Sequence, residues 1–250
     1  MNPKQARQDP SVSYRPVLCL PKTGSTSFTE LLRASGEQAR HEWDSLAVLD
    51  LGSSYFRQDV AQFRASWLSH RAKLLQGDWD VNTALYAVLA EVSPDRAKAL
   101  GMDPLWLCRS PRPWLRSIVA WSMRFASDPY RHRWLLHHRG FVARRDPGLA
   151  QQMPLDPSGP EELLRYWLPV WLSFHELVIE RGCLFRLTHQ LPASHHANSS
   201  HFDRRLFDYL ERLIPPFPAL SGNLASDRIC LEKCRSFCDQ MYSGLGSKSG

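Results

Sequence analysis

The chain has 250 residues, of which 43% are hydrophobic and 22% are charged, and its formal net charge is +6. This balance excludes a globally disordered chain, and the length fits one domain, or at most two, around a large core. Six cysteines are too dilute for a disulfide scaffold, and no apolar run approaches the roughly 18 residues of a membrane-spanning helix.

The excess of positive charge indicates an anionic partner, which leaves nucleic acid, an anionic cofactor and an acidic glycan open. Residues 1–14 are polar and lack the apolar core of a signal peptide, so we expect a loose N-terminal arm. We predict a cytoplasmic protein with reduced thiols. A lumenal fragment stays open as the alternative, and Asn198 would then be a glycosylation site.

The first structured feature is a short apolar run at residues 17–20, which is bounded by prolines and is typical of a buried parallel strand. After it, Gly24 permits a tight turn, and the next residues can cap a helix that ends near residue 34. Such a turn directs backbone N–H groups and a helix N-terminus at one point. The turn therefore predicts an anion site made by Lys22 with three hydroxyls, those of Ser25, Thr26 and Ser27.

A second strand is expected at residues 38–43, and it carries charged side chains near its end. In open α/β sheets the ligand crevice lies at the carboxyl ends of the strands, so His41 and Glu42 are candidates to share the crevice of Lys22. A solvated loop is the alternative for this segment. Because neighbouring residues of a strand point in opposite directions, we expect only one of these two side chains to face the crevice.

The middle of the chain reads as helices followed by one more buried strand. Apolar residues at helical spacing predict helices at 56–72 and 81–92, with a loop at 76–79 and a short helix or turn at 94–101. Residues 104–108 are a buried strand that runs into Arg109. Pro113 then suits the first turn of the next helix, which carries Ser117.

Residues 131–145 contain five arginines and no acid. They are interpreted either as a basic rim that attracts an anionic ligand or as a solvated loop with snorkelling arginines. Together with the proline-rich stretch at 147–160, they suggest a substrate-side loop region over residues 127–160.

The last third reads as a helix at 161–181 that Pro169 should kink or restart, then a buried strand at 183–187 and closing helices at 202–213 and 227–242. The final helix places three thiols on one face, which we expect to be buried rather than to bind a metal: Cys230, Cys234 and Cys238. A polar loop between the strand at 183–187 and the helix at 202–213 holds three histidines that we expect to be exposed: His195, His196 and His201. Buried strands that alternate with helices predict an α/β fold, a three-layer sandwich around a central parallel sheet.

Two segments resemble the nucleotide-binding motifs of sulfotransferases that use 3′-phosphoadenosine 5′-phosphosulfate (PAPS). Residues 21–26, Pro-Lys-Thr-Gly-Ser-Thr, are similar to their 5′-phosphosulfate loop, whereas a nucleotide triphosphatase loop has its lysine after the glycines. Arg109, with Pro111 two residues later and Ser117 eight residues later, is similar to their 3′-phosphate motif. A guanidinium fork and a hydroxyl are suitable phosphate donors. Arg186 and Leu191 resemble parts of a late segment of the same family.

The resemblance implies one sulfotransferase domain over residues 1–250, with the P-loop NTPase-like sulfotransferase fold, PAPS as the sulfuryl donor, adenosine 3′,5′-bisphosphate (PAP) as the product, and no metal. The glycine-rich C-terminal loop of the cytosolic steroid and phenol enzymes has no counterpart, so the chain is closer to the carbohydrate and protein type. The implied cofactor-binding residues are Lys22, Thr23, Gly24, Ser25, Thr26, Ser27, Arg109 and Ser117.

The family's chemistry implies that an acceptor hydroxyl attacks sulfur in line while Lys22 neutralises the leaving phosphate. Glu42, twenty residues beyond Lys22, matches the glutamate base of many such enzymes, and His41 is the alternative, with Asp78 a third candidate. The expected partner is a carbohydrate or other hydroxyl acceptor, either anionic or fitted to an apolar pocket, and not nucleic acid. Nothing in the sequence sets the oligomeric state.

Two other functions stay open at this level. A small-molecule kinase of the same fold would need an acidic magnesium-binding strand end, where this sequence offers arginines. A non-catalytic protein of the same fold that binds an anion or a sulfated glycan would depend on the basic segment and not on Glu42.

Overall fold

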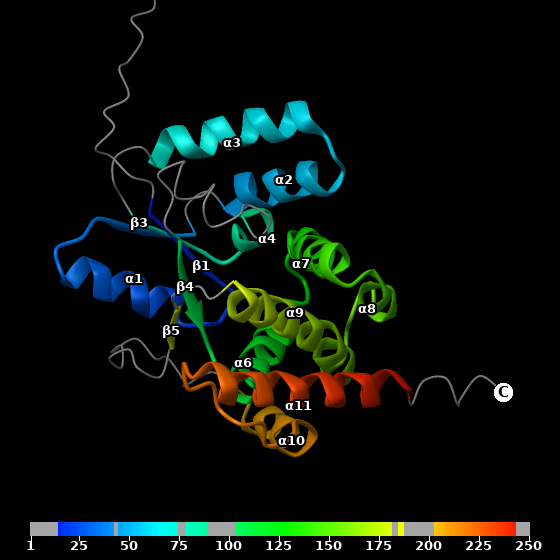
Figure 1. The fold of residues 1–250 in the computed structure, drawn as a ribbon. Helices are drawn as coiled ribbons and strands as arrows, with labels where there is room; N and C mark the ends of the chain where they lie inside the picture. The colour runs from blue at the N-terminus through cyan, green and yellow to red at the C-terminus, as the bar shows by residue number, and fades with distance from the viewer. Residues whose placement is uncertain are drawn as a thin grey trace, which may run out of the picture.

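A parallel β-sheet organises the molecule. The computed structural model describes residues 15–42, 45–74, 79–89, 104–181, 185–187 and 203–243. Within these ranges the sheet has five strands in the order β2-β3-β1-β4-β5, and every neighbouring pair is parallel (Figure 1). The strands are β1 (Arg15–Cys19), β2 (Ala39–His41), β3 (Trp79–Asn82), β4 (Leu105–Cys108) and β5 (Phe185–Leu187). Strand β1 is the central strand. Its apolar residues are buried on both faces of the sheet, as is usual in parallel sheets covered on both sides.

The two faces of the sheet are covered unequally. One face carries α1 (Ser25–Ala34), which packs Phe28 against alternate residues of the strands, Val17, Cys19, Val81 and Leu107. The other face buries Leu18 and Trp106 in the main core, beneath four helices (Figure 1). These are α4 (Tyr86–Leu89), α6 (Pro111–Arg124), α7 (Arg131–Arg145) and α9 (Pro160–Glu180). The prediction of an α/β sandwich around a parallel sheet is confirmed.

The remaining helices form an outer shell around the main core. Helix α2 packs against α3 and α7, α8 against α7, α10 against α6, and α11 against α9. The bounds are α2 (Ser45–Phe56), α3 (Val60–Leu74), α8 (Pro147–Gln152), α10 (Arg204–Leu213) and α11 (Leu224–Ser243). Helices α2 and α7 approach closely at Gly52, where an added Cβ would lie 2.1 Å from Nδ1 of His137, so this contact requires glycine.

Helix α9 is continuous through Pro169, where the sequence suggested a kink or a new start. A proline within a helix leaves the carbonyl four residues earlier without its N–H partner. Here that carbonyl, of Arg165, accepts a hydrogen bond of 2.6 Å from the hydroxyl of Tyr242 on α11. Packing between α9 and α11 therefore replaces the lost backbone bond.

The sequence-based assignment was wrong over residues 79–89. The described part of the predicted helix at 81–92 is instead the end of β3 followed by the single turn of α4, and the rest of that helix lies outside the described residues. Strand β3 is buried although it carries Asp80 and Asn82, which are 0% and 2% exposed. A buried strand with two polar residues lacks the continuous apolar run by which such strands are recognised.

Residues 127–160 are also not a loop region, since α7 and α8 occupy most of them. Two predictions at the C-terminal end are confirmed. Helices α10 and α11 lie close to the expected ranges, and the three thiols of α11 are buried. No helix in the described ranges is both long and apolar enough to cross a membrane. Several sequence-based expectations lie outside the described residues: the arm 1–14, Asp78, Leu191, His195, His196, Asn198 and His201.

Candidate functional site: a basic crevice at the carboxyl edge of the sheet

The loop between β1 and α1 has the strained backbone of an anion-binding turn. Lys22 and Gly24 both have left-handed conformations, with φ of 61° and 93°, which a residue other than glycine adopts at a cost. The loop is closed by a bond of 3.3 Å from the Thr23 amide to the Leu20 carbonyl. Helix α1 then begins at Ser25 without a side-chain cap. Its positive end and first amide groups are thus directed at the space beside Lys22, as the sequence predicts.

The second predicted motif meets this loop directly. Arg109 follows β4, the parallel neighbour of β1, so both motifs leave the same edge of the sheet. Nη1 of Arg109 donates to the Lys22 carbonyl at 2.8 Å and to Oγ of Ser117 at 3.2 Å. The Ser117 hydroxyl in turn donates to the Pro113 carbonyl at 2.9 Å within α6. Segments almost ninety residues apart are therefore joined by one guanidinium group.

Two tryptophans that the sequence analysis did not single out hold these loops in place. Nε1 of Trp114 donates to the Pro21 carbonyl at 2.6 Å, and Nε1 of Trp171 donates to the Arg109 carbonyl at 3.0 Å. Both side chains are fully buried. Buried indole N–H groups need a partner, and here the partners are carbonyls of the two segments that follow β1 and β4. The position of Trp114 next to Pro113, at the start of a helix, is the only sequence signal that could have indicated this role.

His41 and Glu42 both reach the same crevice, although strand alternation predicts that only one should. Strand β2 ends at His41, and Glu42 has a left-handed backbone with φ of 48°, which ends the alternation. Nε2 of His41 lies 2.7 Å from Oγ of Ser25, the first residue of α1. Oε1 of Glu42 accepts a hydrogen bond of 2.5 Å from the hydroxyl of Thr83. Burial lowers the pKa of the Lys22 ammonium group, and the Glu42 carboxylate is close enough to oppose that lowering.

The sequence analysis did not identify Thr83 because it predicted no strand immediately before this residue. The turn after β3 is set by Asn82, whose Oδ1 accepts the amide N–H groups of Ala84 and Leu85, both at 2.9 Å. This turn presents the Thr83 hydroxyl to Glu42 from the strand that lies between β1 and β2. The carboxylate is thereby held in one orientation.

The crevice concentrates positive charge that is partly withdrawn from water. Burial lowers the pKa of Lys22, and the nearby Arg109 guanidinium lowers it further, whereas Glu42 opposes this effect. Burial, followed by repulsion from Arg116, also lowers the pKa of Arg109. These directions mean that the cations repel one another, and a bound anion would relieve that repulsion. Burial is the main reason that the pKa of His41 lies below its usual value, so its imidazole is neutral at pH 7.

The basic segment at 131–145 does not join this crevice through the contacts that the structure defines. Its arginines form ion pairs and hydrogen bonds elsewhere on the molecule: Arg131 with Asp156, Arg133 with Asp50, Arg139 with the Ala150 carbonyl, Arg144 with Tyr55 and Arg145 with Glu180. Two of its histidines are buried in the main core. Nε2 of His137 lies 2.8 Å from the Ala84 carbonyl, and Nδ1 of His138 lies 2.6 Å from the Tyr86 hydroxyl. Neither the basic rim nor the solvated loop describes this helix.

Comparison of the chain with protein-family models, with curated proteins and with solved structures found no match. The crevice offers an uncapped helix N-terminus, a half-buried ammonium group, a guanidinium group beside a hydroxyl, and a carboxylate next to a neutral imidazole. Such a set can bind two anionic groups and accept a proton between them.

Proposed function

We propose that this crevice binds PAPS and that the protein transfers its sulfuryl group to a hydroxyl of an acceptor. The observation that carries the proposal is the link from Arg109 to both the Lys22 loop and Ser117, because it would hold the two proposed phosphate sites on one frame. The 5′-phosphosulfate would lie at the loop of residues 21–27, and the 3′-phosphate at Arg109 and Ser117. The order of the five parallel strands supports the further proposal of a P-loop NTPase-like sulfotransferase fold.

The transfer needs no covalent enzyme intermediate. The acceptor oxygen forms a bond to sulfur as the bond from sulfur to the 5′-phosphate oxygen breaks, and PAP leaves with the electron pair. Negative charge grows on the departing phosphate, where Lys22 and the N-terminus of α1 would stabilise it. The acceptor hydroxyl must lose its proton to a base within the crevice.

We assign the base to Glu42 and a positioning role to His41. The hydroxyl of Thr83 orients the carboxylate of Glu42 within the crevice. His41 is engaged with Ser25 in the proposed phosphosulfate loop, so its first role would be to set the orientation of that hydroxyl. A neutral imidazole could also accept the proton, which makes His41 the alternative base.

Labelled PAPS and a panel of hydroxyl acceptors test this assignment. The Glu42→Gln variant should lose about 10²- to 10⁴-fold in kcat, as expected for loss of a general base, and should still bind PAP. The His41→Gln variant should lose less and should keep the pH–rate profile of the parent protein. If His41→Gln instead abolishes the acidic limb of that profile, the base is His41. Full activity in both variants would reject the pair.

A further inference from the structure

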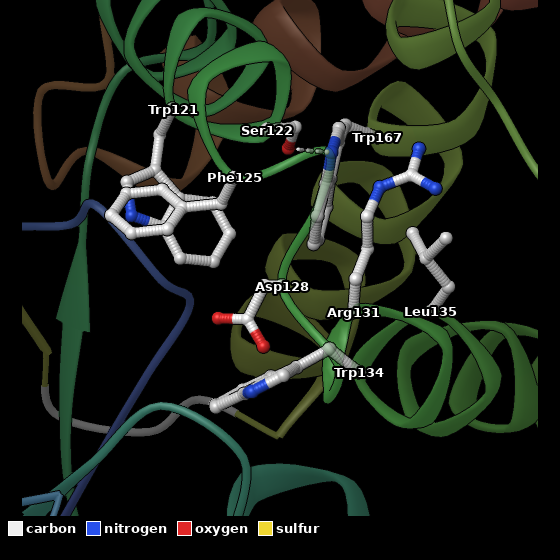
Figure 2. Close-up of a pocket in the computed structure, with 8 residues that line it drawn as sticks. All are labelled: Trp121, Ser122, Phe125, Asp128, Arg131, Trp134, Leu135 and Trp167. Carbon is white, nitrogen blue, oxygen red and sulfur yellow. Dashed lines mark hydrogen bonds between the residues drawn. The ribbon is translucent and has the colours of Figure 1, made fainter.

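A small aromatic pocket lies on the face of α6 that also carries Ser117. Figure 2 shows its lining side chains, which come from α6, α7, α9 and the connection between α6 and α7. They are Trp121, Ser122, Phe125, Asp128, Arg131, Trp134, Leu135 and Trp167. The pocket is small and open to solvent: the centre of a water-sized sphere can move within about 20 Å³ of it. It therefore has room for one compact group and not for an oligosaccharide.

The aromatic walls are held in fixed positions. The rings of Trp121 and Phe125 contact each other with centroids 5.0 Å apart. Trp134 stacks on the buried ring of His138 at 5.4 Å. Nε1 of Trp167 donates to the Ser122 hydroxyl at 2.9 Å, which satisfies its polar atom. Four aromatic side chains thus line one small volume, and the indole N–H of Trp167 is already bonded to Ser122 (Figure 2).

One charged group points into this volume. The carboxylate of Asp128 lies between the rings of Phe125 and Trp134 (Figure 2). Its Oδ1 accepts the Tyr130 amide at 2.7 Å, and no side-chain cation of the described ranges is paired with it. The guanidinium of Arg131 points away from the pocket, where it binds Asp156 at 2.6 Å and the Pro157 carbonyl. Arg124 lies over the Phe125 ring, 6.0 Å from its centroid.

We propose that this pocket binds an organic cation, the ammonium group of a small amine or quaternary ammonium compound. Aromatic faces attract a cation through their quadrupoles, and the attraction is strongest where water is excluded. The carboxylate of Asp128 supplies the matching charge at short range. An anionic group would meet that same carboxylate and the negative faces of the rings, so the pocket discriminates against it.

The pocket lies further along α6 than Ser117 of the crevice. Ser117, Trp121 and Arg124 are spaced by four and then three residues and so lie on one helix face. Arg124 is near enough to Lys22 to lower the pKa of its ammonium group, and it also contacts Phe125 of the pocket. If the proposed sulfotransferase function is correct, the acceptor is a hydroxyl compound with an ammonium group. The binding of the cation itself does not depend on that function.

Calorimetry with choline and with its neutral isostere 3,3-dimethylbutan-1-ol tests the pocket, because the two differ in the charged atom. Choline should bind the full-length protein at least about tenfold more tightly than the isostere. Asp128→Asn should remove that preference, since asparagine can still accept the Tyr130 amide but carries no charge. Asp59→Asn is the matched control, because Asp59 is an exposed carboxylate that also accepts a backbone amide close in the chain, that of Gln62 in α3.

Equal affinities for choline and the isostere, or an unchanged preference in Asp128→Asn, would overturn the proposal. A preference lost equally in Asp59→Asn would overturn it too, because the effect would then be one of overall charge. PAP binding measured on the same samples separates the two proposals. If choline binds and PAP does not, the sulfotransferase function fails and the cation pocket stands; the reverse result rejects the pocket alone.

Discussion

Exchange of Arg109 for lysine is the sharpest perturbation of the proposed nucleotide site. Nη1 of Arg109 supports the Lys22 loop and Ser117 at the same time, and the rest of the guanidinium would face the 3′-phosphate. Lysine keeps the positive charge but has no planar fork, so it cannot support the loop and bind a phosphate bidentately at once. Arg109→Lys should therefore weaken PAP much more than a nucleotide that lacks the 3′-phosphate.

The expected size follows from the number of bonds that change. Hydrogen bonds to charged groups contribute about 1.5–3 kcal/mol each, so loss of one such bond to the 3′-phosphate lowers PAP affinity by roughly 10- to 150-fold. Ser117→Ala removes a neutral donor that the Pro113 carbonyl already engages. Its effect should be smaller, on the order of a few-fold.

Titration calorimetry of PAP and adenosine 5′-phosphate against each variant measures this difference. Arg112→Lys is the matched control, because the Arg112 guanidinium is occupied by Glu211 through contacts of 2.8 Å to its carboxylate and to its carbonyl. The control should bind both nucleotides as the parent protein does. If Arg109→Lys weakens PAP and adenosine 5′-phosphate equally, Arg109 only supports the loop, and the assignment of the 3′-phosphate site is refuted.

Three further results are expected. Lys22→Ala should lower sulfuryl transfer by about 10²- to 10³-fold in a labelled-PAPS assay, and turnover like that of the parent protein would reject its role. Thr83→Val removes the hydrogen bond that orients Glu42, so it should lower kcat by about tenfold and leave PAP affinity unchanged. If Thr83→Val lowers kcat by the same factor in a Glu42→Gln background, Thr83 acts elsewhere. Burial lowers the pKa of His137 to about 4 and of His175 to about 3, so between pH 6.5 and 4 the unfolded chain binds protons that the folded chain does not. The free energy of unfolding should then fall by about 2 kcal/mol per histidine from pH 7 to pH 5 in urea titrations, and His175→Gln should reduce that fall; a pH dependence unchanged by the substitution would contradict this account.

The parts of the site that the sequence predicts are local in the chain. The turn at residues 21–27 follows from one apolar strand, one glycine and a run of hydroxyls. Arg109 and Ser117 follow from the strand end and the helix that begins there. That these segments should meet is a consequence of parallel strands, which place all their carboxyl ends at one edge of the sheet.

The parts that the sequence does not predict depend on tertiary contacts. Strand β3 is hidden by two buried polar residues, Asp80 and Asn82, and Thr83 was lost with it. The simultaneous approach of His41 and Glu42 depends on one left-handed residue after β2, which no periodicity reveals.

Helix α7 was mistaken for a loop because part of its buried stripe is made of histidine. Leu135, His138, Phe141 and Val142 have helical spacing, and all four are buried. If histidine is counted as polar, His138 interrupts the apolar stripe, and the surrounding arginines also favour a solvated segment. In the structure those arginines pair with acids and a carbonyl on α8, on α9 and in the connection between them.

The central claim is that the crevice is a PAPS site, and calorimetry of PAP with the full-length protein tests it most directly. We expect tight binding in the absence of Mg²⁺, with an enthalpy that is unchanged when Mg²⁺ is added, because Lys22 and Arg109 would supply the positive charge. A preference for Mg²⁺–ATP over PAP would indicate a kinase instead. Failure of both nucleotides to bind would contradict the account altogether.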